Sequence, residues 1–481
     1  MRATLALIAL IILQAGFVTI RASAQQIEFD AYDYNRRLGQ SVNLGNTLEA
    51  PNEGDWGFTL QPWHFETIAA GGFDSVRVPI KWSGHADATS PYQIDTTFFE
   101  RIDWVIDQAQ SNDLAVILNV HHYDEIHSDI EGHRDRLAGL WSQIGERYRD
   151  EPTTSVFFEI LNEPNDQFTS TRWQDVMEQS LAVIRETNPD RQVIVGGNNW
   201  NGVSGLVRLR LPEEDRNLIG TFHYYSPFEF THQRAEWVDG ADAWLGTTWD
   251  GTEAEENAVL RDFDLVQNWS ERFDRPVLLG EFGAYRFGDM DSRALWTEAV
   301  TQAAEERDFA WSYWEFGAGF GTFNRSSRTW VEPIYDALSP TSFMNLDGEP
   351  GLTVNDADVL SGAIAFQITD PHYDLDGDGQ VTERDLDYWI FFSNNLQGDV
   401  DLDGDVDFPD FLQLSSSFGG VGTWSSGDLT GDGRVGFNDF LKLSANFGQT
   451  APFQNQTVPE PNAHAFLMFA IASLLLARRR R

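Results

Sequence analysis

Two glutamates carry the clearest chemical signal in this sequence of 481 residues. Glu163 ends the apolar run SVFFEILNE (155–163), and Glu281 ends the run RPVLLGE (275–281). A continuous apolar run bounded by turn residues is typical of a strand that is buried on both faces. The carboxyl end of such a strand is where parallel α/β barrels keep their reactive groups. A pair of carboxylates in that place indicates hydrolysis of glycosidic bonds, which needs one group to protonate the leaving oxygen and another to support the sugar cation.

Further polar or aromatic side chains lie in or at the ends of the other apolar runs. Arg77 interrupts the run DSVRVPI (74–80), where a cation needs a partner that a carboxylate nucleophile would supply. The other candidates of this kind are His121, His122, His223, Tyr225 and Trp314. The histidines could instead bind zinc, but the sequence lacks the paired-histidine spacing of H-E-x-x-H sites. We therefore expect them to position groups around the carboxylates, and Trp314 to stack on a sugar ring.

Apolar runs alternate with amphipathic stretches from about residue 27 to residue 340. The expected strands are 41–46, 74–80, 114–122, 155–163, 191–199, 219–225, 275–281 and 309–316. The stretches between them, such as 95–110 and 136–150, carry apolar residues near helical spacing. Eight strands alternating with helices predict a closed (β/α)₈ (TIM) barrel. A doubly wound open sheet is the alternative. Polar residues at nearly every strand end favour the closed barrel, in which all these ends surround one opening, the mouth of the barrel.

The segments around these residues resemble glycoside hydrolase family 5, the large cellulase family of retaining (β/α)₈ hydrolases. The resemblance spans about 27–340 and includes VNLGNTLEAPNEGDWG (42–57), VRVPIKW (76–82), ILNVHHYDE (117–125), FFEILNEPN (157–165), TFHYYSPFEFTHQ (221–233), LLGEFGAYR (278–286) and WSYWEFGAGFG (311–321). It looks closest to the endo-β-1,4-glucanases, some of which also cut β-mannans.

The resemblance implies a role for each candidate. Glu281 is the expected nucleophile and Glu163 the expected acid/base residue, while Asn162 is expected to bond the sugar 2-hydroxyl. Arg77 and Tyr225 are expected to keep Glu281 ionised and oriented. The residues expected to contact or position substrate are Asn46, Glu49, Arg77, His121, His122, Asn162, His223, Tyr225, Trp237 and Trp314.

The predicted function is therefore a secreted, retaining endo-β-1,4-glucanase that needs no cofactor for catalysis. A β-mannanase or mixed-linkage β-glucanase of the same family is one alternative. A catalytically inactive carbohydrate-binding or calcium-dependent adhesion protein of the cell surface is another. The sequence disfavours the inactive alternative, because a catalytically inactive relative would usually have lost Glu163 or Glu281.

An acidic repeat occupies the next predicted domain, 341–450. Three copies, 374–385, 399–410 and 428–439, align without gaps, and 345–356 is a weaker copy. Aspartates at the first, fifth and twelfth positions and glycine at the sixth follow the EF-hand pattern, in which loop oxygens bind calcium. The predicted ligands are Asp374, Asp376, Asp378, Thr382, Asp385, Asp399, Asp401, Asp403, Asp407, Asp410, Asp428, Thr430, Asp432 and Asp439.

Aspartate at the twelfth position makes these loops similar to those of dockerins, the cohesin-binding modules of cellulosomal enzymes. The resemblance implies a small α-helical domain with structural calcium, and a cohesin-like or cell-surface partner. Short helices are expected at 410–419 and 439–448. The alternative is a solvated acidic linker, because 341–450 holds 20 Asp and Glu against 3 Lys and Arg.

The net charge and the cysteine content exclude several kinds of partner and site, and the two ends of the sequence indicate where the protein acts. A formal net charge of −42 argues against nucleic acid as a partner. The absence of cysteine excludes disulfides, thiolate catalysis and thiolate zinc sites.

Residues 1–24 are typical of a secretory signal peptide cleaved after Ala24, with a retained membrane anchor as the alternative. The segment 451–481 combines VPEP (458–461), the apolar run 465–477 and four arginines. It resembles a PEP-CTERM sorting tail, which membrane-bound machinery recognises and removes. The protein is thus expected to be secreted or held at the cell surface.

Overall fold

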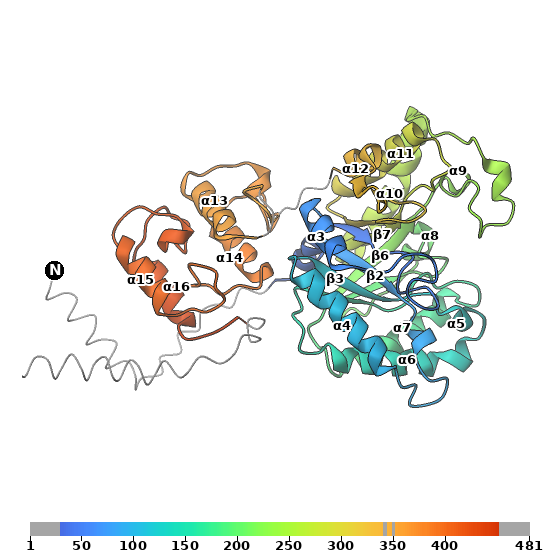
Figure 1. Cartoon of the computed structure of the whole chain (residues 1–481), viewed down its shortest axis with the longest axis horizontal. Helices are drawn as coiled ribbons and strands as arrows, with labels where there is room; N and C mark the ends of the chain where they lie inside the picture. Colours follow the sequence, from blue (N-terminus) through green and yellow to red (C-terminus); the bar gives the residue numbers. More distant parts are fainter. Residues whose placement is uncertain (1–28, 340–343, 349–351, 452–481) are drawn as a thin grey trace, which may run out of the picture.

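A computed structural model describes residues 29–339, 344–348 and 352–451. The predicted signal peptide, and the predicted sorting tail beyond Ala451, lie outside these residues. Figure 1 shows a large barrel on the right and a smaller group of helices, coloured orange to red, on the left. Within the described ranges, no helix has both the length and the apolar character needed to cross a membrane.

Eight parallel strands close into the barrel in sequence order. They are β1 (Gln40–Asn43), β2 (Ser75–Ile80), β3 (Ala115–Val120), β4 (Val156–Glu159), β5 (Val193–Gly196), β6 (Leu218–Tyr224), β7 (Val277–Phe282) and β8 (Ala310–Tyr313). Every strand of the barrel except β1 is buried along its whole length, as the continuous apolar runs predict. The predicted (β/α)₈ barrel is confirmed. The open doubly wound sheet is wrong, because β8 pairs back onto β1.

Helices surround the strands. The principal ones are α3 (Pro62–Ala70), α4 (Thr96–Gln110), α6 (Ile130–Arg147), α7 (Ser170–Arg185), α10 (Glu253–Phe273), α11 (Met290–Glu305) and α12 (Glu332–Leu338). Helix α4 illustrates how the sequence sets them: the Asp95 side chain accepts the first free N–H groups, and Phe99, Ile102 and Ile106 form the buried face. Short helices α5 (Asp124–Ser128), α8 (Val203–Leu206) and α9 (Phe228–Thr231) follow β3, β5 and β6.

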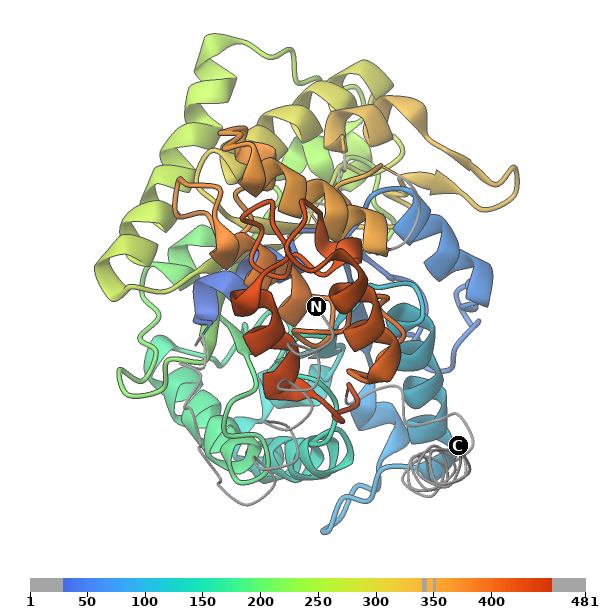
Figure 2. The same cartoon turned by 90° about the vertical axis from the view of Figure 1, so that its left-hand side faces the viewer.

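The end of the barrel at which the strands begin packs against α2 (Ala31–Leu38) and the acidic repeats. The repeats contain α13 (Val354–Ala365), α14 (Glu383–Phe392), α15 (Phe408–Ser417) and α16 (Phe437–Asn446). Helix α13 packs against α14, and α15 against α16. Figure 2, viewed from this side, shows the orange and red repeats in front of the barrel.

The four acidic loops share a set of hydrogen bonds to the twelfth residue. In all four copies the twelfth-position aspartate accepts N–H groups from the second, third and ninth residues of its loop; these aspartates are Asp356, Asp385, Asp410 and Asp439. The described part of the weaker copy therefore shares these hydrogen bonds with the other three. The helices expected at 410–419 and 439–448 are present as α15 and α16, and each is followed by a glycine with positive φ.

Candidate active site

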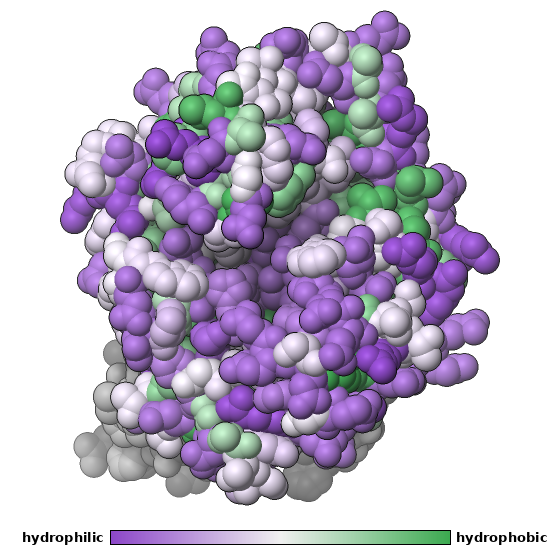
Figure 3. Space-filling model, turned by 90° about the vertical axis from the view of Figure 1, so that its right-hand side faces the viewer, coloured by the Kyte–Doolittle hydropathy of each residue, from purple (hydrophilic) through white to green (hydrophobic). Residues whose placement is uncertain are grey.

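The carboxyl ends of the strands open on the face turned away from the repeats. Figure 3 views this face, which is hollowed near its centre and lined mostly by hydrophilic residues there. A cavity of about 820 Å³ lies beside the ends of β5 and β6, within the size range of small-ligand sites. Glu163, Trp200, His223, Tyr225, His232 and Trp237 are among the residues that line it.

Arg77 on β2 organises the floor of the mouth. Its side chain is fully buried, and its five N–H groups all have acceptors. Two of them go to the Glu159 carboxylate at 2.6 and 2.8 Å, and the other three go to Asn43, Asn162 and Glu281 at 2.8, 2.9 and 2.7 Å. A buried guanidinium satisfied in this way fixes the position of every partner around it.

Glu281 lies within β7 and is almost completely buried. Its Oε1 accepts from Arg77, and its Oε2 accepts from the Tyr225 hydroxyl at 3.1 Å. The pairing register of β6 with β7 shifts after Phe222, which places His223 opposite Glu281. Burial raises the pKa of Glu281, while His223 and Arg77 oppose that rise. The carboxylate is therefore held between a cation and a hydroxyl donor.

Gly280 makes room for this arrangement. A Cβ atom at Gly280 would lie 2.7 Å from Thr221 Oγ1 and 3.2 Å from His223 Nε2. Only glycine lets β7 approach β6 closely enough to bring His223 beside Glu281.

Glu163 lies four residues beyond the end of β4, so the strand is shorter than the run 155–163 suggests. Its backbone is left-handed, with φ of 49°, and the Asn165 side chain donates to its carbonyl at 2.8 Å. This turn directs the carboxyl toward His223, whose Nδ1 is 2.7 Å from Glu163 Oε1. Burial, the largest cause, raises the pKa of Glu163 to about 7 against the opposing effect of Arg77. Near neutral pH Glu163 therefore exchanges its proton readily.

One oxygen of Glu163, one oxygen of Glu281 and a ring nitrogen of His223 all lie within 4.8 Å of one another. The same three groups could in principle hold a metal ion. Both Glu281 oxygens are already engaged, however, and the Arg77 cation is 2.7 Å away, which disfavours a second cation. The burial of His223 lowers its pKa to about 4, so this ring is neutral near pH 7.

His121 and Trp314 lie on the wall of the mouth. Their rings stack with centroids 5.7 Å apart and an angle of 11° between the planes. His121 Nδ1 is 2.9 Å from Asn119 Oδ1, which fixes the imidazole orientation. Burial holds the pKa of His121 well below its usual value, so the stacked ring is uncharged.

Asn46, Glu49 and His122 contact one another rather than the carboxylate pair in the described part of the chain. The Glu49 carboxylate accepts from the backbone N–H of Asn46 and, at 2.9 Å, from that of Thr47. His122 Nδ1 is 3.3 Å from the Glu49 carbonyl. Glu49 is buried, which raises its pKa to about 8. The structure therefore places these three in the loop after β1 and at the end of β3, where they shape the wall.

Trp237 is 60% exposed and lines the same cavity as Glu163. Its ring packs edge-on against Tyr285, with centroids 4.9 Å apart. An exposed, supported indole beside a polar cavity is a suitable surface for a sugar ring.

Sequence reasoning missed four residues here. Glu159 and Asn43 are direct partners of Arg77, and Trp200 and His232 line the cavity. The signal for Glu159 was present, because a carboxylate inside the apolar run SVFFEILNE needs a buried cation as much as Arg77 needs an anion. Asn43 and His232 lie within the segments 42–57 and 221–233, but the sequence does not show which side chains they meet.

The pKa of Glu163 predicts the alkaline side of the pH profile. A general acid is active while protonated, so kcat/KM is expected to fall as pH rises through about 7. Glu163→Ala should lower kcat/KM on polysaccharide by roughly 10²–10⁴-fold, but should lower it much less on an aryl glycoside whose leaving group needs no proton. Initial rates across the pH range measure both effects. The wild type on both substrates is the control, and an equal loss of kcat/KM on polysaccharide and on the aryl glycoside would exclude this role.

The repeats contain two further acidic clusters. Asp374, Asp376 and Asp378 form one, and Asp399, Asp401 and Asp410 form the other, each with carboxylate oxygens within 4.8 Å. In the third loop, Thr430 Oγ1 bridges Asp428 and Asp439 at 3.4 and 3.0 Å. The remaining predicted ligands, Thr382, Asp385, Asp403, Asp407 and Asp432, lie on the same loops. Buried Oδ1 atoms of Asp374 and Asp407 have no hydrogen-bond partner within the described structure.

Comparison with protein families gives one match. The family described as Cellulase (glycosyl hydrolase family 5) matches residues 45–319. The chain is 40% identical to Endoglucanase H of Acetivibrio thermocellus over 316 residues and 30% identical to Endoglucanase B of Clostridium cellulovorans over 319 residues. These matches cover 64% and 60% of this chain but 33% and 71% of the relatives. The chain thus spans about a third of the length of Endoglucanase H.

Solved structures agree with this match. Thermotoga maritima Cel5A in complex with cellobiose superposes with a TM-score of 0.63 at 44% identity, over 64% of this chain and 100% of that chain. Its complex with mannotriose gives the same values. The cellulose synthase subunit Z of Clostridioides difficile superposes with a TM-score of 0.61 at 35% identity, over 63% of this chain and 99% of that one.

Proposed function

The chain belongs to glycosyl hydrolase family 5, the cellulase family, and on that premise we propose that it is a retaining endo-β-1,4-glucanase. It would hydrolyse internal β-1,4 bonds of β-glucans by double displacement. The observation that carries this proposal is that an oxygen of Glu163 lies within 4.8 Å of an oxygen of Glu281. Retaining enzymes hold their two carboxyl groups ~5–5.5 Å apart, whereas inverting enzymes leave ~6.5–9.5 Å for a water molecule.

In the first step Glu281 attacks the anomeric carbon while Glu163 protonates the departing glycosidic oxygen. Arg77 and Tyr225 hold the two Glu281 oxygens, so the carboxylate stays ionised and oriented for attack. Glu163 has no such direct cation, and its pKa of about 7 suits proton transfer to the leaving group.

In the second step Glu163 takes a proton from water, which hydrolyses the glycosyl–Glu281 ester and restores both carboxyl groups. Arg77 donates to Asn162 Oδ1 at 2.9 Å, which leaves the Asn162 amide N–H groups free to donate. We assign their acceptor as the sugar 2-hydroxyl, where a hydrogen bond strengthens in the transition state.

The stereochemistry of the first product tests the reaction. We expect the β-anomer to appear first when a soluble β-1,4-glucan is digested and followed by proton NMR before mutarotation. Initial release of the α-anomer would exclude double displacement. A chemically blocked reducing end on the substrate ensures that the signal comes from new chain ends.

Two alternatives are open for the substrate. The superposition on a mannotriose complex favours β-mannanase activity as the second candidate, and a mixed-linkage β-glucanase is the other alternative. A panel of soluble β-glucans and β-mannans, each digested with equal enzyme, ranks these by kcat/KM. Binding of every polysaccharide without hydrolysis would favour the inactive carbohydrate-binding or adhesion protein instead.

The three clear acidic loops are proposed to bind structural calcium. Their donors are all oxygens, the ligand type calcium prefers, and the partnerless Oδ1 atoms of Asp374 and Asp407 are available to it. Removing calcium with a chelator should reduce the protease resistance of 352–451 and the helical circular dichroism, because clustered carboxylates then repel one another. Magnesium in excess controls for ionic strength. Unchanged resistance and dichroism would refute structural calcium.

The repeats are also proposed to bind a cohesin-like or cell-surface protein partner. Phe408, Phe411, Phe440 and Phe437 form a continuous row across α15 and α16, with successive ring centroids 6.0, 6.5 and 6.2 Å apart. Phe408 and Phe437 are 55% and 64% exposed. A contiguous exposed aromatic row is typical of an interaction surface.

Secretion and processing are proposed from the two ends of the sequence. We infer that residues 1–24 are removed on export and that 451–481 is recognised by membrane-bound sorting machinery, so the enzyme acts outside the cell or at its surface. Intact mass measurement of the exported protein tests both cleavages.

A further inference from the structure

The base of the barrel and the repeats share one apolar cluster. The interior residues of the strands at this end, including Ile117, Phe157 and Leu278, belong to the same buried cluster as Leu386, Trp389 and Phe392 of α14. The layer between strands and outer helices forms a separate cluster. The repeats are thus packed as a continuation of the barrel interior.

Helix α2 joins the two parts. Tyr34 of α2 packs edge-on against Phe392 with centroids 5.2 Å apart, and Phe29 lies 4.6 Å from Phe391. The buried Tyr388 hydroxyl donates to the Asp33 carbonyl at 2.8 Å. These contacts fix α14 against the element that immediately precedes β1.

Asn394, just past the end of α14, reaches the start of β4. Its Nδ2 donates to Ser155 Oγ at 3.0 Å, and its Oδ1 accepts from the Thr154 hydroxyl. Because β4 leads to Glu163, α14 supports a strand that positions the catalytic mouth.

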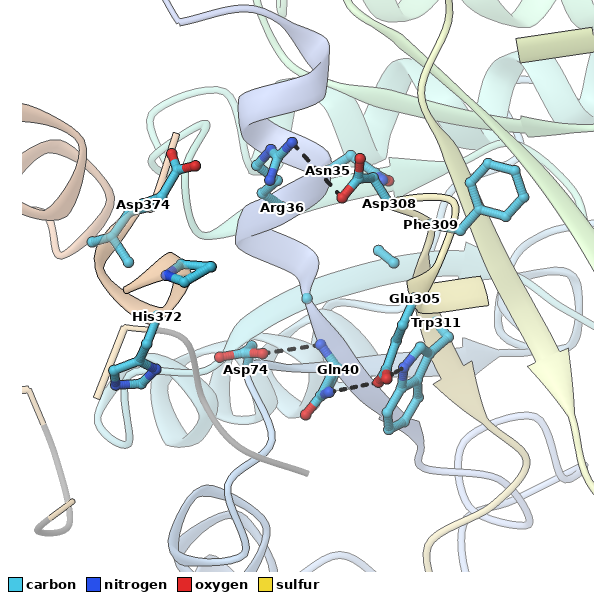
Figure 4. Close-up of a pocket in the computed structure, with 14 residues that line it drawn as sticks. Asn35, Arg36, Gln40, Asp74, Glu305, Asp308, Phe309, Trp311, His372 and Asp374 are labelled. Atoms are coloured by element: carbon cyan, nitrogen blue, oxygen red, sulfur yellow. Dashed lines mark hydrogen bonds and ion pairs between the residues drawn. The ribbon is translucent and has the colours of Figure 1, made fainter. Parts of the chain in front are cut away.

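The acidic loop 374–385 runs directly into α14 and touches α2. A Cβ atom at Gly377 would lie 2.1 Å from the Arg36 guanidinium, so this cation sits directly over the loop backbone. Arg36 also pairs with Asp308 at 4.0 Å. Figure 4 shows this junction, where Arg36 and Asp308 from the barrel face His372 and Asp374 from the repeats across a cavity of about 300 Å³. The conformation of this loop therefore sets how α14 meets the barrel.

The other two clear loops lack this connection. Within the described residues, the polar and ring contacts of 399–410, 428–439, α15 and α16 stay inside the repeats; examples are Ser425 to Asp358 and Lys442 to Glu383 and Asp387. Of the three loops, only 374–385 is therefore coupled to the barrel.

We propose that loop 374–385 and α14 form a calcium-dependent base plate of the catalytic barrel. Calcium bound in this loop stabilises the barrel itself, whereas calcium in loops 399–410 and 428–439 stabilises only the repeats. The partnerless Asp374 Oδ1 supplies the oxygen that the ion would take up. This inference rests on the proposed calcium sites and adds that they stabilise different parts of the protein.

Thermal unfolding of the full chain tests the proposal. Trp389 and Trp424 are the only two of the 17 tryptophans beyond residue 339, so tryptophan fluorescence reports mainly on the barrel. Saturating calcium should raise the melting temperature of this signal by roughly 5 °C or more over chelator. Asp374→Asn with Asp378→Asn should abolish that rise. The matched pair Asp428→Asn with Asp432→Asn, which alters the same two loop positions, should keep it.

A third variant separates contact from ion binding. Asn394→Ala removes the bonds to Thr154 and Ser155 without touching a loop, so it should reduce the calcium-dependent rise while calcium stoichiometry measured by titration calorimetry stays unchanged. If the wild type binds no calcium, the proposed calcium sites fail. If it binds calcium but the fluorescence transition does not move, or both loop pairs lower it equally, the base-plate proposal alone is overturned.

Discussion

Glu281→Gln is expected to lower kcat on a β-1,4-glucan by roughly 10⁴-fold or more, because an amide cannot form the glycosyl ester. Glutamine keeps the shape of the side chain: its Oε1 can still accept from Arg77, and its amide N–H can donate to the Tyr225 hydroxyl oxygen, so the fold should be retained. Initial rates of reducing-sugar release, measured with a large excess of variant enzyme, give the ratio.

The control for this variant is Glu332→Gln, which makes the same chemical change at an exposed position on α12. Its kcat should equal that of the wild type. A melting temperature for Glu281→Gln close to the wild-type value would show that lost activity reflects chemistry rather than unfolding. Undiminished activity of Glu281→Gln would refute the assignment of the nucleophile and with it the proposed reaction.

Arg77→Met is expected to destabilise the barrel by about 3–5 kcal/mol, because it leaves the Glu159 and Glu281 carboxylates buried without their cation. For a barrel of this size the melting temperature should fall by roughly 6–20 °C. Activity should also fall steeply, since Glu281 and Asn162 lose the donor that orients them. Calorimetry and initial rates measure the two effects.

The pH dependence of this loss identifies its cause. Without Arg77 one of the two groups that oppose the effect of burial on the pKa of Glu281 is lost, so the carboxyl takes up a proton at higher pH than in the wild type. The destabilisation should therefore be largest at alkaline pH and shrink as pH falls and the buried charge is neutralised.

Arg191→Met is the matched control, since Arg191 is equally buried but donates to backbone carbonyls and to Asn188 instead of to carboxylates. Its destabilisation should vary little with pH. If Arg77→Met lowers the free energy of unfolding by the same amount at every pH, then lost packing is responsible, and not a buried carboxylate without its cation.

The fold was readable because each strand is a short, continuous apolar run. All eight runs predicted as strands overlap a barrel strand, since burial on both faces demands apolar residues at nearly every position. Strand ends were harder to place: β4 stops at Glu159, and the last four residues of the run, Glu163 among them, lie outside the strand. Leu161 and Ile160 stay buried there as well, so hydrophobicity could not mark the boundary.

The residues of the site were readable to different degrees. Glu163, Glu281 and Arg77 are conspicuous because burying a charge beside or inside an apolar run costs free energy unless the charge has a partner. Glu159 is equally conspicuous, but its role as the bidentate partner of Arg77 depends on two strands lying side by side. Asn43 and His232 lie within the quoted segments 42–57 and 221–233, but only the structure shows that Asn43 meets Arg77 and that His232 lines the cavity.

The sequence by itself therefore determined the chemical groups available to this protein: a carboxylate pair, a buried cation, and three loops rich in carboxylate oxygens. Tertiary structure decided how the two glutamates differ. Arg77 and Tyr225 bind both oxygens of Glu281, whereas Glu163 faces a neutral His223 and has its pKa raised by burial to about 7. Tertiary structure also placed α14 against the barrel base, because ring packing and hydrogen bonds between residues more than 200 positions apart leave no local pattern in the sequence.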